Sequence, residues 1–149
     1  MEGKSKLPYS VLVVVCSLEN QVLLLERARH PGYWQSVTGS LEEGETKIQT
    51  ARRELLEETG ICAGDNLVDW HYSNCFNLLE LWRHRYAPEI THNTEYVFSL
   101  TIPTSTTIKV AATEHRNYCW LPWQEAAKTC FSWSNRDAIL MLQNSIQSC

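Results

Sequence analysis

The spacing of apolar residues alternates along the chain between patterns typical of strands and patterns typical of helices. Residues 11–15 form a continuous apolar run, Val-Leu-Val-Val-Val, which predicts a strand buried on both faces. A second run at residues 21–25 follows a Glu-Asn turn, so we expect the two segments to form a hairpin. The aromatic-rich segment 33–37 predicts a short strand that runs into a turn at Thr38-Gly39.

Residues 46–59 carry the clearest helical pattern. Thr46 and Gln49 have the spacing of a capping box at the helix start, and Gly60 is placed to end the helix. The apolar positions recur at helical spacing and predict one buried stripe, formed by Ile48, Ala51 and Leu55.

The rest of the chain predicts further strands followed by helices. Strands are expected at residues 67–86 and 94–102, with a loop at 88–93 between them, and shorter strands near 107–110 and 117–121. Two helices are expected to close the chain. The first follows Leu121-Pro122-Trp123, and the second is capped by Ser134 or Asn135 and has an apolar stripe of Ala138, Ile139, Leu142 and Ile146. This order predicts an α+β fold, a mixed sheet covered by helices in a single domain over residues 1–149.

Composition narrows the classes of function. A net charge of −4 supplies no basic field for nucleic acid, so any phosphate ligand must be held locally. The longest apolar run, at residues 11–16, is far shorter than the roughly 20 residues that span a membrane. The six cysteines show no paired spacing, so free thiols in a cytoplasmic protein are expected, with a disulfide framework or a zinc site as the alternative.

Three glutamates of the predicted helix, Glu54, Glu57 and Glu58, project within one 100° sector at about 100° per residue. A solvated acidic face is the simplest explanation for such a cluster. However, Glu54 and Glu58 repel each other across one turn, and Glu57 and Glu58 oppose the helix dipole at its C-terminus. A hard cation such as Mg²⁺, or alternatively Mn²⁺, would relieve both effects.

Residues 39–61 also contain a longer series of fixed spacings. The pattern G-x5-E-x7-R-E-U-x-E-E-x-G-U, where U is a bulky aliphatic residue, is matched at every position by Gly39, Glu45, Arg53, Glu54, Leu55, Glu57, Glu58, Gly60 and Ile61. This segment resembles the complete signature of the Nudix hydrolases, the Nudix box.

The resemblance implies an α/β/α sandwich in which a loop-helix-loop presents glutamates to a divalent metal ion. It implies that Glu54 and Glu58 bind the metal directly, and that Glu57 is a further ligand or an acceptor beside it. Arg53 would orient the acids through a bidentate ion pair with Glu45. Glycines at the two ends of the box would serve backbone geometry, where a side chain would clash or force strain.

Outside the box, four stretches resemble the bacterial Nudix enzymes of folate synthesis that hydrolyse dihydroneopterin triphosphate to dihydroneopterin monophosphate and pyrophosphate. The stretches are residues 33–46, 83–88 with 93–95, 113–115 and 132–136. The resemblance implies that Glu114 is a further metal ligand or the general base, and a plain loop carboxylate is the alternative. Two other functions remain open: a Nudix pyrophosphatase of nucleoside triphosphates (dATP or an oxidised nucleotide), and a Nudix-fold binding module without catalysis.

The same resemblance implies a substrate pocket for a small-molecule triphosphate, lined by Lys6, Arg27, Thr38, Phe76, Asn77, Leu78, Leu79 and Ser132. Lys6 and Arg27 are candidates for the phosphate tail, and Arg83 and Arg85 are expected to alternate on one strand face. Each of these cations could equally be a solvated surface residue. The flat pterin ring would suit aromatic walls, for which the candidates are Trp34, Phe76 and Trp133.

Overall fold

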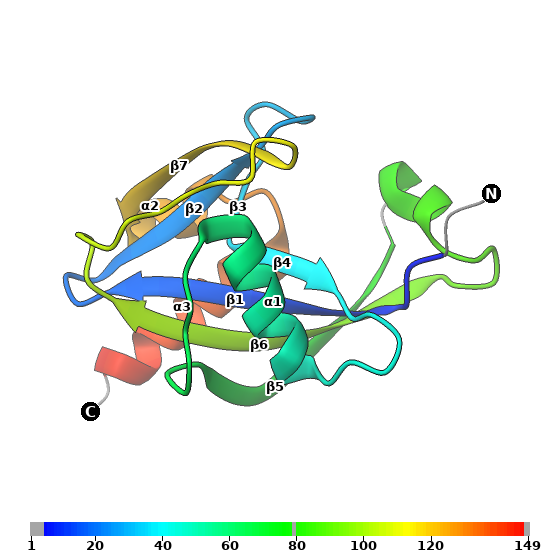
Figure 1. Ribbon diagram of the computed structural model, residues 1–149, viewed down its shortest axis with the longest axis horizontal. Helices are drawn as coiled ribbons and strands as arrows, with labels where there is room; N and C mark the ends of the chain where they lie inside the picture. The colour runs from blue at the N-terminus through cyan, green and yellow to red at the C-terminus, as the bar shows by residue number, and fades with distance from the viewer. Residues whose placement is uncertain (1–4, 79, 148–149) are drawn as a thin grey trace.

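The centre of the protein is a parallel pair of strands, β1 (Tyr9–Ser17) and β6 (His92–Ile102). In the computed structural model, which describes residues 5–78 and 80–147, they belong to a seven-stranded mixed sheet of order β3-β2-β1-β6-β5 (Figure 1). The remaining strands of this path are β2 (Gln21–Arg27), β3 (Trp34–Gln35) and β5 (Val68–Asn77). The two strands off the path are β4 (Val37–Ser40), which pairs with β1, and β7 (His115–Pro122), which pairs with β2.

Strand β1 changes its antiparallel partner along its length. Near its end it pairs with β2, through Cys16 and Val22, as the predicted hairpin requires. Nearer its start, residues 10–13 pair with β4 instead. The β2 and β4 branches therefore separate along β1 (Figure 1). Residues of β1, β2 and β4 line the candidate site.

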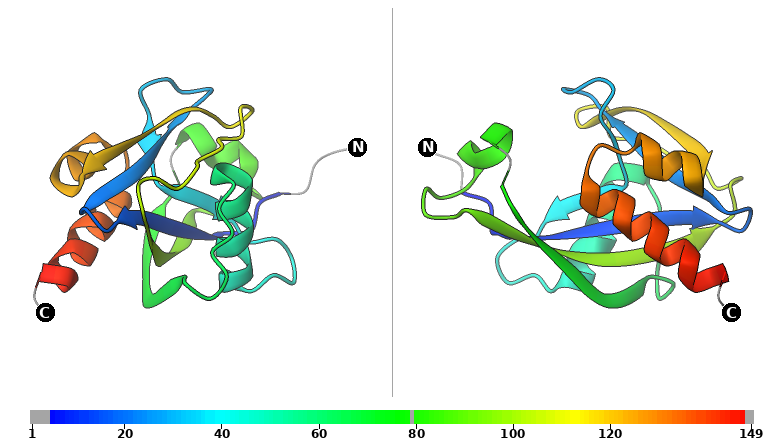
Figure 2. Two further views of the ribbon diagram at one scale, coloured as in Figure 1. Left: turned by 60° about the vertical axis from the view of Figure 1, so that its left-hand side comes forward. Right: turned by 180° about the vertical axis from the view of Figure 1, so that it is seen from behind.

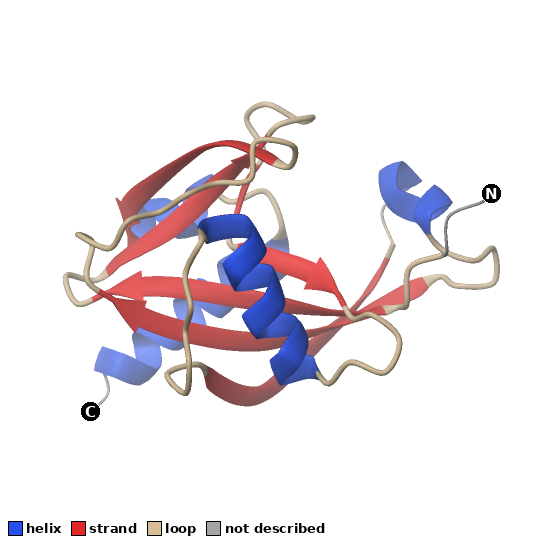
Figure 3. Cartoon of the chain, in the orientation of Figure 1, coloured by secondary structure: helices blue, strands red, loops and turns tan. Residues whose placement is uncertain are grey.

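Helices cover both faces of the sheet, which confirms the expected α/β/α sandwich (Figures 2 and 3). Helix α1 (Lys47–Thr59) packs on one face, where Ala51 and Leu55 are buried against β1 and β6. Helices α2 (Trp123–Thr129) and α3 (Trp133–Gln147) cover the other face. Burial of the two apolar faces supplies the main stabilisation of such a layered fold.

The ends of α1 form as the sequence predicts. The Thr46 hydroxyl accepts a hydrogen bond from the backbone of Gln49, whose side chain in turn accepts one from the backbone of Thr46. At the other end Gly60 has a φ of 78°, the left-handed conformation that favours glycine. The N-terminal capping box and the C-terminal glycine set the two ends of α1, and so they place the acidic residues in its last two turns.

The expected strand at residues 67–86 is wrong in its second half. Strand β5 ends at Asn77, and residues Glu80–Arg85 form a 3₁₀ helix, η1, with Glu80 in its first turn and Arg83, His84 and Arg85 in its last. This distribution of charge favours a helical turn because it complements the helix dipole. Arg83 and Arg85 therefore do not alternate on a strand face.

Three smaller expectations are corrected. Residues 107–110 form no strand, because the Lys109 N–H donates to the Thr59 carbonyl at the end of α1. The expected strand at 33–37 is divided into β3 and β4 at Ser36, whose N–H donates to the Asn135 side chain. Helix α3 begins at Trp133, earlier than expected, and the Ser132 hydroxyl accepts the N–H of Asn135.

The five described cysteines are free thiols, as expected, and Cys149 lies outside the described residues. Ala138, Ile139 and Leu142 of the α3 stripe are buried, whereas the side chain of Ile146 is not among those described. Along residues 5–78 and 80–147, no helix is long and apolar enough to cross a membrane.

Candidate active site

Helix α1 presents its glutamates in two different environments. Glu54 and Glu58 are buried and line a cavity, with exposures of 9% and 1%. The Glu57 side chain is 55% exposed and lies 3.4 Å from the Arg53 guanidinium. The three carboxylates therefore do not point into one space, and within the described residues Glu57 is not part of the cavity wall.

Arg53 holds this side of the helix together. Its guanidinium makes the expected bidentate pair with Glu45, at 2.7 Å from Nε and 2.9 Å from Nη2. The same group donates to Glu54 at 2.7 Å and to the Ser40 carbonyl at 3.0 Å. Because Arg53 hydrogen-bonds the ionised form, it lowers the pKa of Glu45 to about 2. Arg53 is thus a positioning residue that ties the box loop to the acidic helix.

Glu58 is the least satisfied carboxyl group of the site. Within the described residues, neither of its buried carboxyl oxygens accepts a hydrogen bond of ordinary geometry. Burial raises its pKa well above the usual range, and the neighbouring Glu54 and Glu114 carboxylates raise it further. A buried carboxylate without a donor costs several kcal/mol unless a cation neutralises it. The chemistry of this position therefore fits a metal ion.

A second chain segment brings further donor atoms to Glu58. Ligand atoms of Glu58, Glu114 and His115 all lie within 4.8 Å of one another, a grouping that could hold a metal ion. The His115 ring nitrogen Nε2 lies 3.7 Å from a Glu58 oxygen and 3.3 Å from the Gln35 amide. Burial, followed by the positive charge of Arg27, lowers the pKa of His115 to about 4. His115 is therefore neutral at pH 7 and able to offer a nitrogen lone pair.

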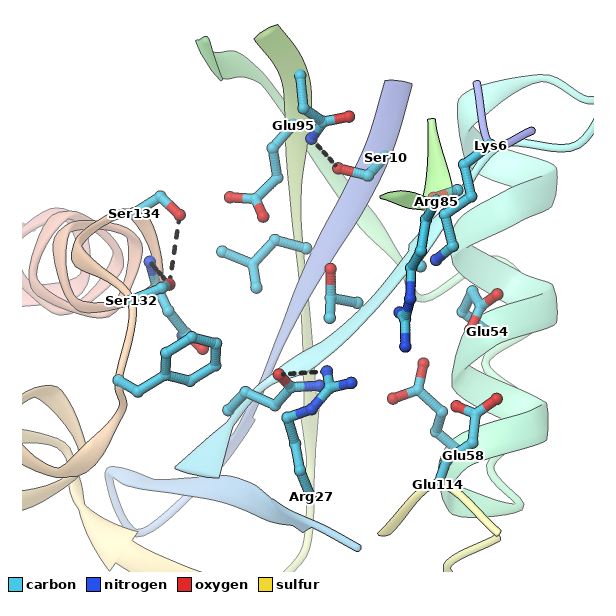
Figure 4. Close-up of a pocket in the computed structure, with 18 of the residues that line it drawn as sticks. Lys6, Ser10, Arg27, Glu54, Glu58, Arg85, Glu95, Glu114, Ser132 and Ser134 are labelled. Atoms are coloured by element: carbon cyan, nitrogen blue, oxygen red, sulfur yellow. Dashed lines mark hydrogen bonds between the residues drawn. The ribbon is translucent and has the colours of Figure 1, made fainter. Parts of the chain in front are cut away.

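The cavity has a volume of about 520 Å³, a size common for small-molecule sites. Three cations, Lys6, Arg27 and Arg85, surround the side that carries the glutamates (Figure 4). Burial and the charge of Arg85 lower the pKa values of Lys6 and Arg27. Neighbouring cations that oppose each other's charge in a partly buried site are well suited to bind a phosphate chain.

The structure brings most of the predicted substrate residues together. The cavity is lined by six of the eight, namely Lys6, Arg27, Thr38, Phe76, Leu78 and Ser132. Asn77 follows Phe76 on β5 but is not part of the described lining, because successive strand residues point to opposite faces. Leu79 lies outside the described residues. Of the expected aromatic walls, Phe76 lines the cavity. The Phe76 and Trp133 rings meet edge to face, with 6.0 Å between their centres. Trp34 packs instead against the core under α2 and α3.

Two buried titratable residues of the cavity, His115 and Glu95, were given no role from the sequence. Both belong to stretches that carried the resemblance, but only Glu114 was given a function there. In β6 the alternation of Asn93, Glu95 and Val97 puts two polar side chains on a buried face. A polar residue at a core position of a central strand is an unusual placement that marks a candidate site.

Glu95 allows a prediction for stability as a function of pH. Burial raises its pKa to about 7, from 4.5 for a free glutamate, while the Ser134 hydroxyl acts in the opposite direction. Because the folded protein holds this proton more tightly than the unfolded chain, the free energy of unfolding is highest below pH 4.5. It falls by about 3 kcal/mol in total as the pH rises from 4.5 to 7. Glu95→Gln removes this loss, so the variant should gain stability over the unmodified protein between pH 5 and 8.

Urea denaturation in a chelator at pH 5 and pH 8 measures this difference. Glu125→Gln, which changes an exposed glutamate of α2, is the matched control and should show no pH-dependent difference. The prediction fails if Glu95→Gln shifts the free energy of unfolding equally at both pH values.

Comparison with known proteins agrees with the arrangement of fold and site. A model of the NUDIX domain matches residues 6–142. The chain belongs to the Nudix family. A solved structure of Caenorhabditis elegans Ap4A hydrolase, at 18% identity, has the same fold with a TM-score of 0.70, over 95% of this chain and 98% of that one.

Proteins with a higher sequence identity to this chain are named for their action on dihydroneopterin triphosphate. The chain is 44% identical over 138 residues to dihydroneopterin triphosphate diphosphatase of Escherichia coli K12, covering 90% of this chain and 91% of that protein. It is 37% identical to the protein of the same name from Haemophilus influenzae, covering 87% and 84%. The solved structure of the Escherichia coli dihydroneopterin triphosphate pyrophosphohydrolase superposes with a TM-score of 0.85 at 43% identity, over 92% of this chain and 95% of that one.

Proposed function

We propose that this protein is a Mg²⁺-dependent diphosphatase that hydrolyses dihydroneopterin triphosphate to dihydroneopterin monophosphate and pyrophosphate. The observation that carries the proposal is the buried Glu58 carboxyl group, which has no hydrogen-bond partner among the described residues and lies beside Glu54 and Glu114. The same cavity is lined by four cations, Lys6, Arg27, Arg29 and Arg85. The similarity to the diphosphatases of two bacteria supports the choice of substrate.

The metal ion would be held by carboxylate oxygens of Glu54 and Glu58. Glu114 and Glu57 are candidate further ligands. Oxygen ligands suit Mg²⁺, and also Mn²⁺, which can use the neutral His115 nitrogen as well. When bound, such an ion polarises phosphoryl oxygens and lowers the pKa of an attacking water. Arg53 keeps Glu54 in place through its hydrogen bond to that carboxylate.

The cations of the cavity would bind the triphosphate. Lys6, Arg27 and Arg85 lie on the side of the cavity near the glutamates, so they would contact the phosphate chain beside the acids that would hold the metal ion (Figure 4). Water supplies the new oxygen, and the bridging bond between the α and β phosphates breaks. Glu114, which is exposed at the rim and therefore reachable by solvent, is the candidate to accept the proton of that water.

A substrate panel tests this proposal. Pyrophosphate release should be fastest with dihydroneopterin triphosphate, measured as kcat/KM beside dATP and an oxidised dGTP, and EDTA should abolish it because the metal site is emptied. Added Mg²⁺ should restore the activity. A preference for either nucleotide with an inert pterin would contradict the proposed substrate, and activity that persists in EDTA would contradict the metal role.

A further inference from the structure

Glu95 occupies a position where a carboxyl group is costly. It lies on β6 between Asn93 and Val97, opposite Ser10 of β1, and its residue exposure is only 6%. Its side chain lines the cavity, and one carboxyl oxygen, Oε1, has no hydrogen-bond partner among the described residues. Unpaired buried carboxyl oxygens are rare in proteins unless a ligand completes them.

The groups around Glu95 are neutral hydrogen-bonding side chains. The Asn93 amide donates to the Ser10 hydroxyl at 2.7 Å, and the Asn93 carbonyl oxygen is a second buried acceptor with no donor among the residues that the structure describes. The hydroxyl of Ser134, at the start of α3, interacts with Glu95 from the opposite wall. Glu95 Oε1 and Asn93 Oδ1 are therefore two buried acceptors that donors of a ligand could pair. The Asn74 amide, opposite Glu95 on β5, is a buried donor that also has no partner among the described residues.

The two ends of the cavity differ in chemistry. In Figure 4, Glu95 lies with Ser10, Ser132 and Ser134 at the end away from Glu58, and Lys6 and Arg85 lie on the Glu58 side. A substrate whose phosphates occupy the Glu58 side would therefore place its other end near Glu95. Phe76, which also lines the cavity, provides an aromatic surface for a flat ring.

We propose that Glu95 determines ring specificity by accepting two hydrogen bonds from the ring N–H and the 2-amino group of a 2-amino-4-oxo heterocycle. This inference rests on the proposed function and extends it to the part of the substrate that does not react. Two adjacent N–H donors match the two oxygens of one carboxylate in a bidentate pair. Pterins and guanine carry this donor pair, whereas adenine has an acceptor nitrogen beside its amino group and would leave one carboxylate oxygen facing a lone pair.

Glu95→Gln tests the inference because it exchanges one acceptor for a donor at almost constant volume. The amide still accepts one hydrogen bond, but its NH₂ group opposes the second donor of the pterin and matches the acceptor nitrogen of adenine. The ratio of kcat/KM for dihydroneopterin triphosphate to kcat/KM for ATP should fall about 100-fold in the variant. Glu125→Gln should keep the ratio of the unmodified protein.

The outcomes separate this inference from the proposed function. If the unmodified protein hydrolyses the pterin triphosphate and Glu95→Gln keeps the same substrate ratio, or loses both activities equally, the inference is overturned while the proposed function stands. If neither triphosphate is hydrolysed, the proposed function fails, and binding of neopterin, followed by its fluorescence, decides the inference. Weaker binding of neopterin to Glu95→Gln than to the unmodified protein supports it, and equal binding overturns it.

Discussion

Glu58→Gln should lower Mg²⁺-dependent pyrophosphate release about 1,000-fold and at the same time stabilise the metal-free protein. Activity falls because the substitution removes the most buried negative charge of the site, and with it an oxygen donor for the metal. Stability rises because the unmodified protein must keep a carboxyl group that burial and two neighbouring carboxylates make costly to ionise. The opposite signs of the two effects distinguish loss of a ligand from loss of folding.

The two effects are measured by steady-state kinetics with Mg²⁺ and by thermal unfolding in EDTA and in Mg²⁺. Mg²⁺ should raise the Tm of the unmodified protein and of Glu125→Gln, but not that of Glu58→Gln, since a ligand stabilises only the state that binds it. Unchanged activity in Glu58→Gln, or an equal Mg²⁺ shift in Tm, would refute the metal role of this residue. Glu57→Gln in the same assays tests whether the exposed carboxylate is a ligand at all.

The fold could be predicted from the sequence where local patterns and tertiary packing agree. The hairpin of β1 and β2 and the capped helix α1 are such cases, because their apolar residues meet the core on the faces that the patterns indicate. The prediction failed where a tertiary hydrogen bond decides the outcome. The Lys109 N–H is paired with the end of α1 rather than with a strand, and no local pattern records that choice.

Some features of the candidate site could also be predicted from the sequence, and others could not. The Arg53–Glu45 pair could be predicted because the resemblance to the Nudix box implies it. The different environments of Glu57 and Glu58 could not, because one sector of a helix includes both the wall of the cavity and its solvent-exposed edge. The grouping of Glu114 and His115 with Glu58 depends on how the loop before β7 returns to α1, which spacing along the chain does not encode.

Gly39→Ala should lower metal-dependent activity at least about 100-fold, although it adds only one methyl group. Gly39 lies on β4 directly against Glu54, and a Cβ atom built there would overlap the Glu54 carboxyl group. Glycine is therefore needed at this position because a side chain has no room beside Glu54. Glu54 cannot withdraw freely, since Arg53 holds its carboxylate at 2.7 Å, so the substitution must displace the carboxylate, the Arg53 pair or strand β4. Each displacement moves a proposed metal ligand, and a shift of about 1 Å is enough to cost about 100-fold.

Gly64→Ala provides the matched control. Gly64 has a φ of 59°, so an alanine there is strained by roughly 1 kcal/mol, but its Cβ would meet nothing within 4 Å. Gly64→Ala should therefore lower Tm while keeping kcat and the Mg²⁺ dependence, whereas Gly39→Ala should lose activity and the Mg²⁺ shift in Tm even at temperatures where it is fully folded. If Gly39→Ala retains both, Glu54 has room to move and its present position is not needed to bind the metal. If Gly64→Ala loses activity to the same extent, the loss in Gly39→Ala reports stability rather than the position of Glu54.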